Sequence, residues 1–312
     1  MPTLYDDDQQ LFNADQDRER LSIDYFIANP LTRDHLQQLL QLNGVGVWFA
    51  TRLPTTLLVP CGTPTTGLPG DVDLIGGLLE PDGDFEAAIA QARKDLPEGA
   101  HPSRWYELAA LRTPPVWPPR VDFLVAVEVK AVALKESDEI RVKSRVVEHG
   151  RTQARGLVQL GFDRAALGWL ASTEPVSVVG TNAAQLFIAS ERADLAERRV
   201  RWRVSPTLAE PFGEFIISTG AFPGRSELMS GVVLRPDVLR EAEPIPRSSG
   251  TSVAKMRAHV ETALRSMFAS LPRPTSLAAV VMRVCRKGAC AEVFLRYPTD
   301  TTGCPRCGEA SA

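Results

Sequence analysis

The stretch VDFLVAVEVKAVA, residues 121–133, is almost continuously apolar and rich in β-branched side chains. Such a run predicts a strand that is buried on both faces, in the middle of a sheet. Glu128 and Lys130 interrupt it, and because they are two residues apart they project from the same face of the strand. A carboxylate and an ammonium on so apolar a strand are costly unless something uses them. We therefore expect a central strand that carries chemistry.

Two further patterns surround this strand in the sequence. GDVDLI, residues 70–75, places Asp71 and Asp73 at the start of another apolar strand, and Gln153 lies in an expected helix at residues 151–160. Helical spacing also predicts helices near residues 31–42, 84–93 and 105–111. Strands and helices that alternate in this way indicate an α/β fold.

These residues resemble the PD-(D/E)XK nuclease superfamily, whose motifs are G-x-x-D before apolar residues, then E-x-K, then a helix with a glutamine. The matching residues here are Asp73, Glu128, Lys130 and Gln153. The resemblance implies a restriction-endonuclease-like core: a helix, three mixed strands, a helix and a further strand, giving a mixed central sheet flanked by helices. It also requires residues 78–120 to be a helical insertion.

The resemblance implies a metal-dependent nuclease that hydrolyses phosphodiester bonds of DNA, in a bacterial defence or DNA-processing system. Two carboxylates suffice to hold a hard cation that keeps part of its water shell, so Asp73 and Glu128 are expected to bind Mg²⁺ or Mn²⁺. Lys130 would orient the attacking water or stabilise developing charge, and Gln153 would align the strands.

Two other functions remain open. A nucleotidyltransferase would use Asp71, Asp73 and Glu128, although Pro64 and Pro69 disfavour the glycine turn of that family. A catalytically inactive nuclease-fold scaffold would instead bind partners through its C-terminal region. The chain has no G-x-x-x-x-G-K-[ST] phosphate loop, so any unwinding is expected to come from a partner ATPase or helicase.

Basic residues near the helix of Gln153 are candidate DNA contacts. Arg151 and Arg155 are four residues apart and would share a helix face, and Lys143 lies in the loop before them. A local basic stripe can meet phosphates even where the net charge of the chain is −3. The alternative is a solvated surface.

The C-terminal region carries four cysteines in two short-spaced pairs, C-x4-C and C-x2-C: Cys285, Cys290, Cys304 and Cys307. This spacing predicts a structural zinc ribbon with four thiolate ligands; disulfides or free thiols are the alternatives. Arg296 and Arg306 in this segment are candidate contacts to DNA or to a partner protein.

Composition divides the chain into four parts: an acidic N-terminal arm (residues 1–20), the nuclease-like domain (21–239), a linker with an amphipathic helix (240–279) and the zinc ribbon (280–312). No apolar stretch approaches the length of a membrane span, so we expect a cytoplasmic protein with no membrane partner.

Overall fold

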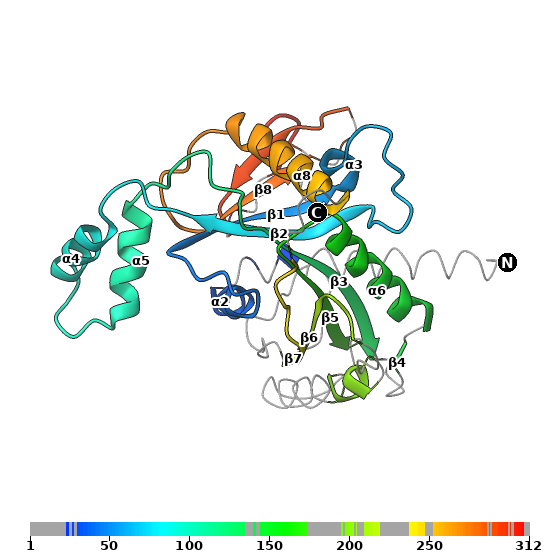
Figure 1. The fold of residues 1–312 in the computed structure, drawn as a ribbon. Coiled ribbons are helices and arrows are strands. Elements are labelled where there is room, and N and C mark those ends of the chain that lie inside the picture. Colours follow the sequence, from blue (N-terminus) through cyan, green and yellow to red (C-terminus); the bar gives the residue numbers. More distant parts are fainter. Residues whose placement is uncertain are drawn as a thin grey trace.

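A computed structural model describes most of the chain. The described residues are 23–24, 27, 30–134, 140–141, 144–173, 195, 197–202, 204, 209–218, 237–246, 252–285, 287, 289–298, 300 and 303–308. They form an α/β fold in which one mixed sheet is flanked by helices (Figure 1). The expected N-terminal arm and Lys143 lie outside the described residues.

The secondary structure follows the alternation expected from the sequence. The strands are β1 (Gly46–Pro54), β2 (Asp71–Leu79), β3 (Val125–Leu134), β4 (Ile140–Arg141), β5 (Arg164–Thr173), β6 (Gly213–Ser218), β7 (Asp237–Arg240), β8 (Val280–Val284) and β9 (Val293–Arg296). The helices are α2 (Pro30–Leu39), α3 (Thr55–Leu58), α4 (Phe85–Asp95), α5 (Pro102–Arg112), α6 (Ser144–Gln159) and α8 (Ser252–Ala269).

The sheet has the order β7-β6-β5-β3-β2-β1-β8-β9, with β4 paired to β3. Strands β1, β2 and β3 form an antiparallel meander, after which α6 crosses over to β5, which is parallel to β3. Strand β6 continues parallel to β5, and β7 is antiparallel to β6. On the other side, β8 is parallel to β1 and antiparallel to β9. The strand β3 is therefore central, as its sequence predicts.

Side chains alternate along β1 between two cores, one on each face of the sheet. Trp48 belongs to the core under α6 and α8, and Phe49 belongs to the core under α2. Figure 1 shows α6 and α8 on one side of the sheet and α2 on the other. On α8, Phe268 is fully buried with its ring edge-on to Trp48, 4.8 Å between ring centroids. This packing fixes α8 to the middle of the sheet.

The helices α4 and α5 lie in the chain between β2 and β3, where helices were expected. They lie together at one end of the molecule, beyond the layers of the sheet (Figure 1). Residues 78–120 therefore contain a helical hairpin that joins two neighbouring strands.

Two elements begin elsewhere than the sequence suggested. Strand β3 begins at Val125, because the backbone N–H of Leu124 donates to the carboxylate of Asp163 at 2.7 Å. Helix α6 begins at Ser144, so Gln153 lies well inside it and not near its start.

The C-terminal segment is joined to the sheet, whereas the sequence suggested a separate ribbon after a linker. Strand β8 pairs with β1 over Trp48–Thr51. Within the expected linker, the backbone N–H of Ile245 donates to the carbonyl of Asp163 at 2.8 Å, and Ala242 is buried. The described part of residues 240–312 thus extends the main sheet and its core. Among the described helices, none is both long and apolar enough to cross a membrane.

Candidate active site and metal centre

The candidate active site lies where β2 and β3 separate. Their last paired residues at this end are Leu74 and Val127, and the same register would place Asp73 across from Glu128. Instead of continuing the ladder, the side chain of Asp73 turns to β3, and its Oδ2 accepts a hydrogen bond from the backbone N–H of Val129 at 2.8 Å. This hydrogen bond ties Asp73 to the strand that carries Glu128, which lies 55 residues further along the sequence.

Lys130 completes this group. Its Nζ lies 2.8 Å from Oε1 of Glu128, and both side chains are on the face of β3 that lies under α6. The exposed fractions are 9% for Asp73, 2% for Glu128 and 9% for Lys130. Burying two carboxylates and one ammonium carries a desolvation penalty that their ion pairing only partly offsets. The structure thus brings together three of the four predicted catalytic residues.

The pKa of Asp73 is raised above its ordinary value. Burial is the main cause, and the nearby charge of Asp71 acts in the same direction; the charge of Lys130 and the hydrogen bond from Val129 oppose it. The charged form of Asp73 is therefore held at a cost, which a bound cation would relieve.

Helix α6 covers the site through small residues. A Cβ at Gly150 would lie 3.0 Å from Cγ of Lys130, and one at Gly156 would lie 2.7 Å from the carbonyl oxygen of Gly67. Gln153, midway between these glycines, has a buried Oε1 with no hydrogen-bond partner among the described residues. This is the fourth predicted residue, and the structure places it on the helix above the site without a direct hydrogen bond to the other three.

His149 is a neighbour of the site that the sequence analysis did not single out. Its pKa is lowered by desolvation and, to a smaller extent, by the charge of Lys130, and both effects favour the neutral imidazole. His149 and Gln153 are four apart on α6 and share a helix face. This spacing could have identified His149 from the sequence as a residue on the same helix face as Gln153.

Arg52 is a second neighbour of the site, and no sequence pattern predicted it. It has a φ of +54°, in the left-handed region that non-glycine residues rarely adopt. Thr51 pairs with Leu74 and Leu53 with Val72, so Arg52 lies across from Asp73. Its guanidinium is held by Asp24 at 2.8 Å.

The irregular backbone at Arg52 coincides with a change of face in β2. Leu74 belongs to the core under α2, whereas Val72 belongs to the core under α6 and α8. In a regular strand these two residues would share a face. The regular alternation of β2 is therefore interrupted at Asp73, whose side chain accepts the hydrogen bond from Val129.

The two arginines expected to contact DNA are held by carboxylates of the protein. Arg151 Nε lies 3.1 Å from Oε1 of Glu214, a fully buried residue, and its Nη2 donates to the carbonyl of Val204 at 2.8 Å. Arg155 Nη2 lies 2.6 Å from Oε1 of Glu210. The hydrogen bond to Glu210 is the main cause that raises the pKa of Arg155. Sequence reasoning missed both partners because they lie more than fifty residues away.

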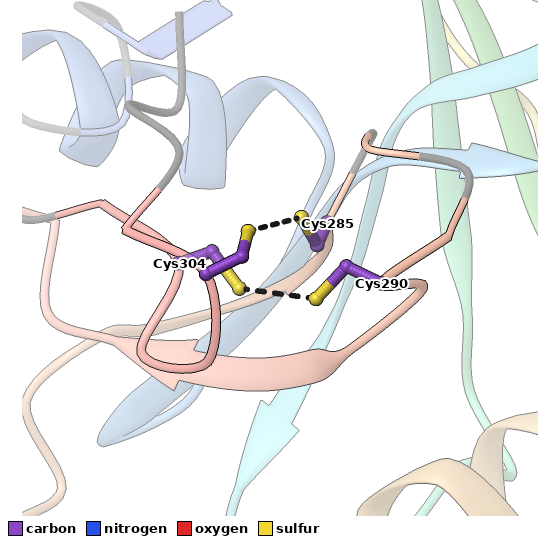
Figure 2. A group of neighbouring side chains, drawn as sticks. Cys285, Cys290 and Cys304 are labelled. Carbon is purple, nitrogen blue, oxygen red and sulfur yellow. Dashed lines mark hydrogen bonds between the residues drawn. The ribbon is translucent and has the colours of Figure 1, made fainter.

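The candidate metal centre is formed by the four predicted cysteines (Figure 2). Their Sγ atoms all lie within 4.8 Å of one another, with Cys285 and Cys307 at 3.6 Å and Cys290 and Cys304 at 3.7 Å. Ligands at a Zn–S distance of about 2.3 Å in a tetrahedron would lie about 3.8 Å apart. All four are free thiols. The cluster is therefore able to hold a metal ion and fits zinc.

The backbone of the cluster favours the thiolate form at one position. Burial raises the pKa of Cys304, but hydrogen bonds from the backbone N–H groups of Cys307 and Arg306 and from neighbouring thiols outweigh it and bring the pKa to about 7. Gly308, at a φ of +68°, closes the turn by donating its N–H to the carbonyl of Cys304 at 2.8 Å. Amide groups that point at sulfur in this way are suited to ligands that bind metal as thiolates.

Comparison with known proteins gives no relative: no family model, no curated protein and no solved structure matches the chain.

Proposed function

We propose that the chain is a metal-dependent nuclease of the PD-(D/E)XK type that acts on DNA. The observation that carries the proposal is the burial of Asp73, Glu128 and Lys130 together where β2 and β3 separate. When the short helix α3, the α4–α5 hairpin and the short strand β4 are set aside, the order α2, β1, β2, β3, α6, β5 also follows the helix, three strands, helix and strand that the resemblance implies. These features support the proposal independently of each other, because one is a side-chain cluster and the other is topology.

The chemistry of the side chains fits a hard divalent cation. Asp73 and Glu128 supply carboxylate oxygens, the ligands that Mg²⁺ and Mn²⁺ prefer. When bound, the ion would neutralise phosphate oxygens and lower the pKa of a coordinated water. The raised pKa of Asp73 means that the carboxylate gains from a nearby positive charge.

Lys130 and the helix above it would position the reacting groups. The ammonium of Lys130 is held by Glu128, and the aliphatic part of its side chain lies close to Gly150. It would orient the attacking water and stabilise the charge that develops on the phosphate. Gln153 has a buried carbonyl oxygen that can accept a hydrogen bond from a water or a substrate group.

A cleavage assay tests this function. Purified protein should cut linear, circular or single-stranded DNA when Mg²⁺ or Mn²⁺ is present, and chelation of the cation should stop it. Asp73→Ala and Glu128→Ala should abolish cleavage while circular dichroism shows a folded chain. Glu148→Ala, which removes an exposed carboxylate that pairs with Arg155, is the matched control and should retain activity. Cleavage by Asp73→Ala at the wild-type rate would reject the proposal.

A nucleotidyltransferase is the second candidate, because Asp71 acts electrostatically on Asp73. It would need both aspartates together with Glu128, and it would assign no role to Lys130. Incorporation of labelled nucleotide in the same assay separates the two reactions. A scaffold without catalysis would show neither reaction, and it would be sought by its binding of an ATPase or helicase partner.

A further inference from the structure

Arg296, in β9, is a buried cation that lines one hollow together with Cys304. The strand joins Cys290 to Cys304 in the chain, and the exposed fraction of Arg296 is 6%. Its Nη1 donates to the carbonyl of Asp300 at 3.3 Å. Its Nε and Nη2 are buried and have no hydrogen-bond partner in the part of the chain that the structure describes.

The unsatisfied atoms form one edge of the guanidinium group. Nε–H and Nη2–H point the same way and are the pair that binds an anion in a bidentate manner. A buried charge with unmade hydrogen bonds is strongly unfavourable. The pKa of Arg296 is accordingly lowered, mainly by burial and next by the charge of Arg283. The charges of Asp300 and Asp24 act in the opposite direction, but no carboxylate of the described residues is hydrogen-bonded to the Nε–Nη2 edge.

The cysteine cluster would add negative charge to the same hollow once its thiols are deprotonated. Arg296 and Cys304 line the same hollow of about 440 Å³, and Cys304 acts electrostatically on Arg296. The guanidinium also lies 5.1 Å from the ring centroid of Phe294, which packs in one cluster with Cys285 and Cys304. Four thiolates around a doubly charged zinc ion leave a net charge of about −2.

We propose that Arg296 is the charge-balancing residue of the zinc centre, its Nε–Nη2 edge directed to the thiolates that form when zinc binds. The inference rests on the zinc assignment and not on nuclease activity. A cation at this position lowers the free energy of the deprotonated ligands and so raises the affinity for the metal. Without metal the same guanidinium is a buried cation whose Nε and Nη2 make no hydrogen bond to the described residues. Arg296 therefore has opposite effects on the two states of the protein.

The test measures zinc affinity and apo-protein stability in the full chain. Arg296→Met keeps the length of the side chain and removes its charge. We expect zinc affinity, measured by competition with a chromophoric chelator, to fall about tenfold or more, while the zinc-free variant melts at or above the temperature of zinc-free wild type. Arg296→Lys should lose less affinity. Arg265→Met, which removes an exposed arginine paired with Glu261 on α8, is the control and should match wild type.

A second measurement uses the wild-type protein and so does not depend on the folding of a variant. In an NMR spectrum, the Nε–H signal of Arg296, assigned by its absence in Arg296→Lys, should shift and exchange more slowly with water when zinc is added. Unchanged zinc affinity in Arg296→Met, or an Nε–H signal that does not respond to zinc, would overturn the inference.

Discussion

The backbone N–H of Val129 donates a 2.8 Å hydrogen bond to Oδ2 of Asp73, a side chain on the neighbouring strand. The carboxylate thus takes the place of a backbone acceptor where β2 and β3 separate. It remains almost entirely buried in that position. An asparagine at this position could accept the same hydrogen bond through its amide oxygen without placing a charge in the buried site.

Asp73→Asn should therefore stabilise the metal-free protein at neutral and alkaline pH. The pKa of Asp73 is raised, so its contribution to stability is full below the ordinary pKa of an aspartate and is lost as pH rises through the raised value. Thermal unfolding at several pH values should show a gain of roughly a few degrees for the variant, growing with pH. A variant that melts below wild type at pH 8 would contradict this.

Much of this site was predictable from the sequence, because its strongest signal is local. Glu128 and Lys130 stand out in the sequence because they are the charged residues within the apolar run of β3. Asp73 is brought close to Glu128 and Lys130 by the pairing of β2 with β3, which the α4–α5 hairpin connects. Only the family resemblance predicted that Asp73 belongs to the same site.

The distant interactions could not be predicted. Nothing local to Arg151 identifies Glu214, which lies on β6, as its partner. No feature of residues 280–284 predicts that β8 pairs with β1 and joins the main sheet. The left-handed backbone conformation of Arg52 could not be predicted from the sequence either, because arginine has no preference for that conformation.

Arg151→Met should destabilise the protein more than Arg155→Met. Glu214 is fully buried between Arg151 and Arg240, and removal of one partner leaves part of its charge unbalanced. We expect a loss of about 2 kcal/mol in the free energy of unfolding. The more exposed pairs of Arg155 should contribute about 1 kcal/mol or less. Chemical denaturation measures both; equal stability of Arg151→Met and wild type would show that the arginine is available for another role.

Gly150→Ala should separate activity from stability. Alanine normally stabilises a helix interior by about 1 kcal/mol relative to glycine, but here its Cβ would lie 3.0 Å from Cγ of Lys130. We expect a folded variant with a lower cleavage rate. At Gly156 the nearest atom is the backbone oxygen of Gly67 at 2.7 Å, so Gly156→Ala should lose stability instead. Full activity in Gly150→Ala would argue against a confined Lys130.

Removal of zinc should destabilise the whole described fold. Strand β8 leads directly to Cys285 and pairs with β1, so the metal centre and the main sheet share a ladder. Free zinc at a thousandfold excess over its dissociation constant would add about 4 kcal/mol. Chelation, or Cys304→Ser, should therefore lower the temperature of a single melting transition. A main transition that is unchanged by chelation would show that the cluster is uncoupled from the sheet.

The most direct test of the proposed nuclease compares Lys130→Ala with Asp71→Ala in one Mg²⁺-dependent DNA cleavage assay. Lys130 lies in the buried site, whereas Asp71 is a less buried residue at the start of β2. We predict that Lys130→Ala abolishes cleavage in a chain that stays folded and still binds DNA, and that Asp71→Ala retains most of the activity. Cleavage that survives Lys130→Ala but is lost in Asp71→Ala would contradict the assignment and favour a nucleotidyltransferase-like use of the aspartates.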